Sequence, residues 1–311
     1  MSTSPSAHSG LLDARQTNAA LPASALADEI KSLLNDASVR VPPRLVHDLP
    51  GGGCLFLMPA HDQRIAITKL ITLTPGNAGS SRPLIQGDVM VFDVASGERR
   101  LILDGPAVTA RRTAAVSLLA ARELAPQAMG PLLIIGAGVQ GRSHLEVFAQ
   151  GLPLREVWVA SRSAASARQL ADHAAALGLA AHVTDDLDRA LARCPLVVTC
   201  TPATEVVLDQ ALSADHFLAA VGAFTPAMRE LGSHLCRQAH LQGRVVLDSP
   251  DARHEAGDLL QAGLPVDHLP TLAQCLQAPE AKAETVRGPV LFKSCGWGGW
   301  DLAAARLASR P

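Results

Sequence analysis

The pattern of apolar and polar positions divides the chain into two parts. Between residues 41 and 104, short apolar runs alternate with turn residues, and this pattern predicts strands at residues 55–58, 64–73, 88–94 and 100–103. From Pro131 onward, short apolar runs alternate with helical stretches, which is typical of a parallel, doubly wound sheet. We expect its strands at residues 132–135, 157–160, 181–183, 196–200, 217–221 and 245–248.

Helical spacing marks two further segments and suggests where the domains divide. Residues 24–37 precede a pair of prolines that blocks a helix, and a second helix is expected from about Thr109 to Pro126. Residues 290–301 have the pattern of a strand, a glycine-rich turn and a helix. Because the second sheet is already complete, we expect this segment to return to the first domain. The predicted division is therefore 1–125 plus 286–311 beside 126–285.

The most informative stretch is residues 131–150, where an apolar run leads into Gly136-x-Gly138-x-x-Gly141 and then into a helical pattern. Glycines there allow a sharp turn, a close approach of backbone N–H groups to a pyrophosphate, and tight packing of helix on strand. The helix N-terminus adds unpaired N–H donors and the positive end of its dipole. An ordinary strand-to-helix turn is the alternative. The flanking strands and helix favour a Rossmann dinucleotide-binding domain.

The end of the next strand indicates which dinucleotide is bound. An acidic residue there would bind the ribose 2′-hydroxyl of NAD, but the chain has Ser161-Arg162-Ser163. A guanidinium flanked by hydroxyl groups suits a 2′-phosphate, because arginine forms charge-assisted, bidentate bonds to phosphate. We therefore expect NADPH, with NADH as a possible substitute. The alternative for Arg162 is a solvated loop charge.

Composition excludes several classes of protein. A formal charge of −2 gives no basic surface for nucleic acid, and the sequence has no run of about 18 apolar residues that would span a membrane. The six cysteines form neither a CxxC pair nor a Cys/His cluster. We expect reduced thiols in a cytoplasmic protein, without a metal site. Because Tyr is absent, a proton donor must be another side chain or water.

Cations at unusual positions are candidates for binding an anionic substrate. Alternation in residues 65–73 places Lys69 on the apolar face of its strand, where an ammonium group is costly unless a site explains it. A snorkelling or edge lysine is the alternative. Arg111 and Arg112 fall in the first turn of the helix expected from Thr109, where the dipole favours anions. Their position suggests a bound carboxylate, but periodicity does not choose between them, and a solvated surface pair is the alternative.

A set of short motifs follows in order along almost the whole chain. They are Lys69, Thr74-Pro75-Gly76-Asn77, Gln86-Gly87, Asp104-Gly105, TARRTAA at 109–115, GAGVQ at 136–140, Val221-Gly222-Ala223, Arg229-Glu230-Leu231 and Phe292-Lys293-Ser294. As a set they resemble the ornithine cyclodeaminase/mu-crystallin family. The closing SCGWGGWD at 294–301 is most similar to the bacterial Δ1-pyrroline-2-carboxylate reductase branch of that family.

The resemblance implies a homodimer in which residues 1–125 plus 286–311 form an α+β substrate-binding and dimerisation domain beside the Rossmann domain. It places the substrate carboxylate on Arg44, Lys69 and Arg112, with Lys69 and Arg112 as catalytic residues. It also assigns Thr113, Val139, Gln140, Arg162, Thr201, Val221 and Ser294 to the cofactor. The glycine turn and the following strand end add Gly136, Gly138, Gly141 and Ser161.

The reaction implied is NAD(P)H-dependent reduction of a cyclic imino acid. Δ1-Pyrroline-2-carboxylate would give L-proline, and Δ1-piperideine-2-carboxylate would give L-pipecolate. Cyclodeaminases carry an aspartate where this chain has Phe224, which argues against ornithine cyclisation, and Leu84 stands where many members have threonine. The alternatives are a cyclodeaminase, an alanine or opine-type dehydrogenase, and a non-catalytic NADPH-binding protein like a crystallin.

Overall fold

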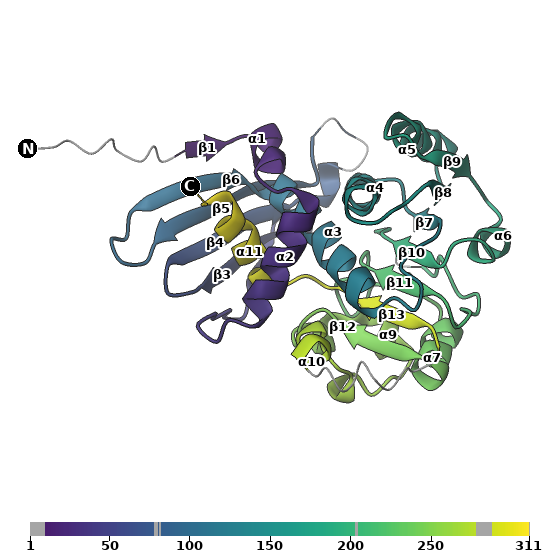
Figure 1. Ribbon diagram of the computed structural model, residues 1–311. Helices are drawn as coiled ribbons and strands as arrows, with labels where there is room; N and C mark the ends of the chain where they lie inside the picture. Colours follow the sequence, from purple (N-terminus) through teal and green to yellow (C-terminus); the bar gives the residue numbers. More distant parts are fainter. Residues whose placement is uncertain (1–9, 78–79, 81, 203–204, 278–287, 311) are drawn as a thin grey trace, which may run out of the picture. The chain divides into compact units, whose positions relative to one another are not determined.

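The computed structural model describes residues 10–77, 80, 82–202, 205–277 and 288–310. They divide into two compact units (Figure 1). Unit 1 comprises Met1–Arg112 and Gly298–Pro311, and unit 2 comprises Thr113–Trp297. Unit 1 contains a mixed sheet and unit 2 a parallel sheet, which confirms the predicted α/β class with a Rossmann-type doubly wound sheet. None of the described helices is long and apolar enough to cross a membrane.

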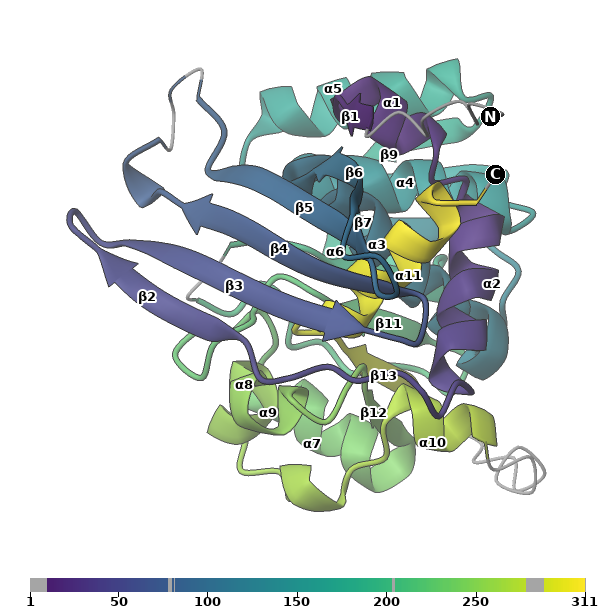
Figure 2. The same cartoon turned by 90° about the vertical axis from the view of Figure 1, so that its left-hand side faces the viewer.

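Unit 1 is a six-stranded sheet with helices packed on one face (Figure 2). The strand order is β1 (Gly10–Leu12), β6 (Arg99–Asp104), β5 (Ile85–Asp93), β4 (Ile65–Leu73), β3 (Gly53–His61) and β2 (Leu45–Leu49). β1 pairs with β6 in parallel, and the other neighbours are antiparallel. Helix α11 (Gly298–Ala308) contacts β3, β4, β5 and helix α2 (Ala23–Leu34). The short α1 (Ala14–Ala19) and the 3₁₀ turn η1 (Pro75–Asn77) complete the unit.

Helix α3 (Gly105–Leu124) runs from unit 1 into unit 2 and begins about one turn before the expected Thr109. Asp104 explains the earlier start, because its Oδ1 accepts a hydrogen bond of 2.8 Å from the N–H of Ala107. Arg111 and Arg112 therefore lie beyond the first turn, where the helix dipole has little effect. The prediction that Arg111 and Arg112 lie in the first turn of this helix was wrong, and the helix dipole therefore does not indicate an anion there.

Unit 2 is a seven-stranded sheet in which every pair of neighbours is parallel. The order is β12 (Arg244–Leu247), β13 (Val290–Lys293), β11 (Phe217–Ala220), β10 (Leu196–Thr199), β7 (Leu132–Ile135), β8 (Glu156–Ala160) and β9 (Ala180–Val183). Each of the six predicted strands agrees to within one residue at either end. The direction of winding reverses between β7 and β10, which is where open sheets of this kind bind ligands.

The helices of unit 2 connect these strands. They are α4 (Val139–Gly151), α5 (Ala164–Ala176), α6 (Leu187–Leu191), α7 (Ser233–Gln242), α8 (Ala252–Glu255), α9 (Gly257–Gln261), the 3₁₀ turn η2 (Val266–His268) and α10 (Leu272–Gln277).

Strand β13 corrects the expected domain division. It lies inside the second sheet, between β11 and β12, so the expectation that this sheet is complete before residue 290 was wrong. Val290-Leu291-Phe292 is a continuous apolar run, the pattern of a strand buried on both faces. The chain returns to unit 1 at Gly298 rather than at residue 286, and the first boundary falls after Arg112 rather than after residue 125.

Arg306 fastens α11 to two other parts of unit 1. Its Nε donates to Oδ2 of Asp62 at 2.6 Å, and its Nη2 donates to Oδ2 of Asp36 at 2.6 Å. Oε1 of Glu29 in α2 lies 3.7 Å from its Nη1. Because Arg306 and Asp62 are buried, removal of the guanidinium would leave the carboxylate of Asp62 without this counter-charge in a region of low dielectric constant, whereas Glu29 would keep its ion pair with Arg310.

We expect Arg306→Met to lower the free energy of unfolding by about 3 kcal/mol or more, because breaking a buried ion pair strands its partner. Urea denaturation of the two proteins measures this difference. The matched control is Arg100→Met, which removes an exposed ion pair with Asp93 and should cost less than about 1 kcal/mol. Equal losses in the two variants would contradict the anchoring role of Arg306.

The effect of Arg306→Met on the free energy of unfolding should also depend on pH. The pKa of Asp36 is lowered to about 2, first by the hydroxyl and N–H of Ser38 and then by Arg306. Burial opposes the shift at Asp62, but backbone N–H groups and Arg306 hold the pKa of Asp62 below its usual value. A carboxyl group whose pKa is lower in the folded than in the unfolded state stabilises the fold at pH values above its unfolded pKa, which is about 4. This stabilisation is lost as pH falls through the pKa of the folded state. The stability difference between wild type and Arg306→Met should therefore shrink as pH is lowered from about 4 toward about 2.

Candidate active site

Unit 1 gathers cations around one buried carboxylate, that of Asp301 in the first turn of α11. Its Oδ2 lies 2.8 Å from Nζ of Lys69, and its Oδ1 accepts a hydrogen bond of 3.2 Å from Nε of Arg112. All three side chains are almost completely removed from solvent. Arg44, which is half-buried, lies close enough to affect the pKa of Lys69. The structure thus brings together the three cations that the resemblance implied for the substrate carboxylate.

The position of Lys69 follows from the alternation of β4. Ile65, Ile67 and Ile71 are buried on the same face as Lys69, whereas Leu70 is exposed on the other. The prediction that this lysine lies on the apolar face is confirmed. Asp301 offsets the cost of burying its ammonium group.

Asp301 was missed from the sequence, although a signal for it was present. Apart from Arg306, which pairs with Asp36 and Asp62, the rest of helix α11 consists of small and apolar residues, and a buried aspartate in such a helix needs its own cation. In the sequence, this aspartate ends the SCGWGGWD motif, and no partner was predicted for it.

The cluster has more positive charge than its own carboxylate can balance. Burial lowers the pKa of Lys69, Asp301 opposes this, and Arg112 and Arg44 add to it, which leaves a value of about 8. Among the residues that the structure describes, Nη1 of Arg112 is buried without a hydrogen-bond partner. One carboxylate therefore pairs with two buried cations, Lys69 and Arg112, and the buried Nη1 donor of Arg112 suits a second, small anion.

Arg111 binds the backbone instead of the carboxylate of Asp301. Its Nε and Nη2 donate to the carbonyl oxygen of Leu21, at 3.3 and 3.0 Å. Of the two adjacent arginines, Arg112 is the one that contacts Asp301.

Unit 2 has a pocket of about 520 Å³ at the carboxyl ends of β7, β8 and β10. The predicted cofactor residues that line it are Gly136, Gly138, Ser161, Arg162 and Thr201. Val139, Gln140 and Gly141 form the first turn of α4, directly after the glycine turn. Thr113, Val221 and Ser294 do not line the pocket; they lie in α3, after β11 and after β13, respectively.

The three glycines have different physical roles. Gly136 has φ of +118°, and a Cβ there would lie 2.8 Å from the carbonyl oxygen of Cys200. A Cβ on Gly141 would overlap the carbonyl oxygen of Gly136. At Gly138, which caps α4, a Cβ would meet no atom within 4 Å. The open space at this helix N-terminus fits a pyrophosphate, which needs close contact with backbone N–H groups.

The far end of the same pocket carries hydroxyl groups and a cation. Ser161, Arg162, Ser163 and Ser166 line it where β8 passes into α5. Ser163 caps α5 by accepting a hydrogen bond of 3.2 Å from the N–H of Ser166. This donor set suits a phosphate group better than a neutral ribose hydroxyl.

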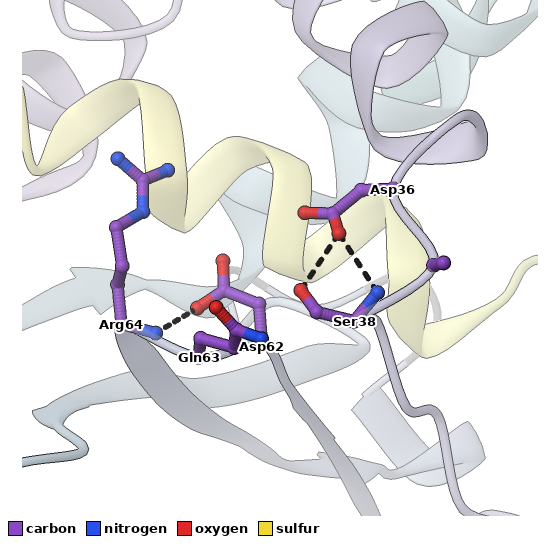
Figure 3. Close-up of a pocket in the computed structure, with 6 residues that line it drawn as sticks. Asp36, Ser38, Asp62, Gln63 and Arg64 are labelled. Carbon is purple, nitrogen blue, oxygen red and sulfur yellow. Dashed lines mark hydrogen bonds between the residues drawn. The ribbon is translucent and has the colours of Figure 1, made fainter.

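A second pocket, of about 370 Å³, lies in unit 1 next to Asp36 and Asp62 (Figure 3). Asp36 accepts hydrogen bonds from the N–H and hydroxyl of Ser38, and Asp62 accepts one from the N–H of Arg64. Because both carboxylates also bind Arg306, protein donors already satisfy them. We assign no ligand to this pocket.

Fold and site together define a protein with a Rossmann dinucleotide-binding unit and a second unit that carries a buried cation cluster. The chain belongs to the ornithine cyclodeaminase/mu-crystallin family, which residues 11–309 match.

Two relatives place the chain more closely within this family, and one solved structure shares its fold. The chain is 38% identical to Δ1-pyrroline-2-carboxylate reductase 2 of Burkholderia ambifaria, over 86% of this chain and 83% of the relative. It is 36% identical to the Δ1-pyrroline-2-carboxylate/Δ1-piperideine-2-carboxylate reductase of Azospirillum brasilense, over 96% of this chain and 94% of the relative. An archaeal alanine dehydrogenase dimer with bound NAD has the same fold, with a TM-score of 0.84 at 20% identity over 96% of this chain and 94% of that one.

Gly138→Ala and Gly141→Ala form a matched pair that tests the glycine turn. We expect Gly138→Ala to leave the melting temperature nearly unchanged but to weaken NADPH binding at least about tenfold, because the methyl group occupies space meant for phosphate. Gly141→Ala should lower both, because its methyl group overlaps backbone. Differential scanning fluorimetry and NADPH fluorescence titration separate the two effects. Wild-type affinity in Gly138→Ala would show that no phosphate lies at this helix end.

Proposed function

We propose that the protein is a ketimine reductase, which reduces Δ1-pyrroline-2-carboxylate to L-proline with NADPH and also accepts Δ1-piperideine-2-carboxylate. The observation that carries the proposal is the cation cluster of unit 1, in which Nη1 of Arg112 has no hydrogen-bond partner in the part of the chain that the structure describes. The same chain has, in unit 2, a pocket lined by the glycine turn that suits a dinucleotide. The names of the two bacterial relatives support the same reaction.

The residues of unit 1 would hold the imino acid by its carboxylate. Nη1 of Arg112 supplies a buried donor, Arg44 adds a second guanidinium, and Lys69 adds an ammonium. Asp301 keeps Lys69 and Arg112 in place, so the substrate meets donors that are already oriented. Fixing the ring in this way accounts for much of the rate enhancement that we expect.

The nicotinamide nucleotide, when bound, supplies hydride to C2 of the ring. The imine nitrogen needs a proton, so that one hydride and one proton together convert C=N into CH–NH. Lys69 is a suitable donor, because burial lowers the pKa of Lys69 to about 8, near the pH at which a proton can both be held and be given up.

Two alternatives have less support. The aspartate of cyclodeaminases is replaced by Phe224, which is partly buried against the apolar core of unit 2 and has no acid–base chemistry. A role in binding NADPH without catalysis would not require a buried excess of cations in unit 1, which is costly to maintain.

We infer a preference for NADPH over NADH from the pocket of unit 2. Ser161, Arg162, Ser163 and Ser166 present one guanidinium and three hydroxyl groups, and the acidic residue of the pocket, Asp185, lies after β9 rather than at the end of β8. That arrangement lacks the carboxylate that would bind both hydroxyls of an unphosphorylated ribose.

We also propose a homodimer that forms through the open face of the six-stranded sheet. Cross-strand pairing places Leu45, Leu57 and Leu70 in one row, and Leu45 and Leu70 are 55% and 37% exposed. A second copy would remove this row from water, and the archaeal alanine dehydrogenase of the same fold is described as a dimer. A cytoplasmic location stays a prediction.

The direct test is oxidation of NADPH, followed at about 340 nm, with each cyclic imine as acceptor. We expect turnover of both imines in wild type, and a loss of about 100-fold or more in kcat/KM for Arg112→Ala, because the substrate carboxylate loses a buried, charged donor. The control is Arg111→Lys, which changes the neighbouring arginine and should retain most activity. A loss within about threefold for Arg112→Ala would rule out the carboxylate role.

Arg162→Ala tests the coenzyme preference. We expect the KM for NADPH to rise at least about tenfold while that for NADH changes by less than about threefold, because only NADPH carries the 2′-phosphate. Arg168→Ala changes an exposed arginine of α5, the helix that follows Arg162, and as the control it should change neither value. Equal effects of Arg162→Ala on the two coenzymes would contradict the phosphate contact.

A further inference from the structure

Glu230 is a fully buried carboxylate that holds the ends of two strands of unit 2. It accepts hydrogen bonds from the N–H and hydroxyl of Thr201, at 2.5 and 2.9 Å, and from the hydroxyl of Thr199 at 3.2 Å. It also accepts one from the N–H of Gly222 at 2.6 Å. Thr199 and Thr201 lie at the carboxyl end of β10, and Gly222 follows β11. One side chain therefore fixes the turns after two adjacent strands.

A second set of buried groups holds Glu230 itself. Oδ1 of Asp258 accepts hydrogen bonds from the N–H of Glu230 at 2.5 Å and from that of Leu231 at 2.9 Å. Oδ2 of Asp258 lies 2.6 Å from Nζ of Lys293, the last residue of β13. The network thus joins the carboxyl ends of β10, β11 and β13, and Glu230 lies in the segment that follows β11 along the chain.

Gly222 is matched to this carboxylate. A Cβ at residue 222 would lie 2.5 Å from Cδ of Glu230 and would overlap the carbonyl oxygen of Thr201. The turn after β11 can approach Glu230 this closely because it carries no side chain at that position. Gly222 and Glu230 therefore contact each other. They are the central residues of two sequence motifs, Val221-Gly222-Ala223 and Arg229-Glu230-Leu231.

The position of this contact in the sheet indicates what it serves. Ser161 and Arg162, which we assign to the adenosine end of the coenzyme, follow β8 on one side of the switch point between β7 and β10. The turns that Glu230 holds lie on the other side, after β10 and β11. A dinucleotide bound across a switch point places its two halves on opposite sides. Thr201, which Glu230 contacts, also lines the pocket.

We propose that Glu230 is a positioning residue for the nicotinamide half of the coenzyme, acting through the turns at Thr201 and Gly222. The inference rests on the proposed binding of NADPH. Buried ions add little net stability compared with an apolar core, so a network of this kind is better explained by the backbone conformation that it fixes. Burial raises the pKa of Glu230, whereas Lys293 and the N–H of Thr201 act in the opposite direction.

The test compares ligands with and without the nicotinamide ring. Affinities of wild type and Glu230→Gln are measured by calorimetry for NADPH and for 2′-phospho-ADP-ribose, which has the adenosine and pyrophosphate but no nicotinamide. We expect Glu230→Gln to weaken NADPH binding at least about tenfold and binding of the fragment by less than about threefold, because the adenosine side of the switch point is unchanged. Asp215→Asn, the same chemical change at an exposed residue of unit 2, should alter neither.

Each other outcome overturns the inference. Equal weakening of both ligands would show a general effect on folding, and unchanged NADPH affinity would show no role. If wild type binds the fragment and NADPH equally, the nicotinamide half makes no contact to position. If wild type binds neither, the proposed function fails and the inference fails with it. Should Glu230→Gln not fold, Thr199→Val removes one donor to the same carboxylate and must show the same selectivity for NADPH, to a smaller degree.

Discussion

The ion pair between Asp301 and Lys69 is the contact on which unit 1 depends. An ammonium group on the apolar face of a sheet is tolerated because a carboxylate from the helix above it meets it in the absence of water. The same carboxylate orients Arg112, so that one residue both permits the burial of the cations and directs their remaining donors. The side chains that we propose for substrate binding are therefore also the ones that make the burial of Lys69 possible.

Unit 2 also contains a buried lysine, and other residues balance its charge. Lys293 ends an interior strand and is neutralised by Asp258, whose other oxygen supports the segment that presents Glu230. Both units therefore carry a buried lysine paired with a buried aspartate from a distant part of the sequence. In unit 1 a donor of Arg112 is left without a partner among the described residues, whereas in unit 2 the extra carboxylate is satisfied by hydroxyl and backbone donors.

Local pattern was sufficient for much of the fold and for part of the site. The strands of unit 2, the glycine turn and the buried face of Lys69 follow from periodicity, because each depends on a few neighbouring residues. Asp301 and Glu230 were not assigned, because their roles arise from contacts with residues distant in sequence. The short strand β1 and the exposed strand β2 lack a strong pattern. Strand β13 was misplaced, because its order in the sheet is a property of topology rather than of its own residues.

The C-terminal segment contributes to both units, with β13 inside one sheet and α11 on the other. Neither unit can therefore complete its core before residues 290–308 are present, and this segment links the folding of the two units. A nascent chain paused before Val290 would expose the edge of β11 and the apolar face of β4 together. The late segment therefore protects an open strand edge in one unit and an apolar sheet face in the other.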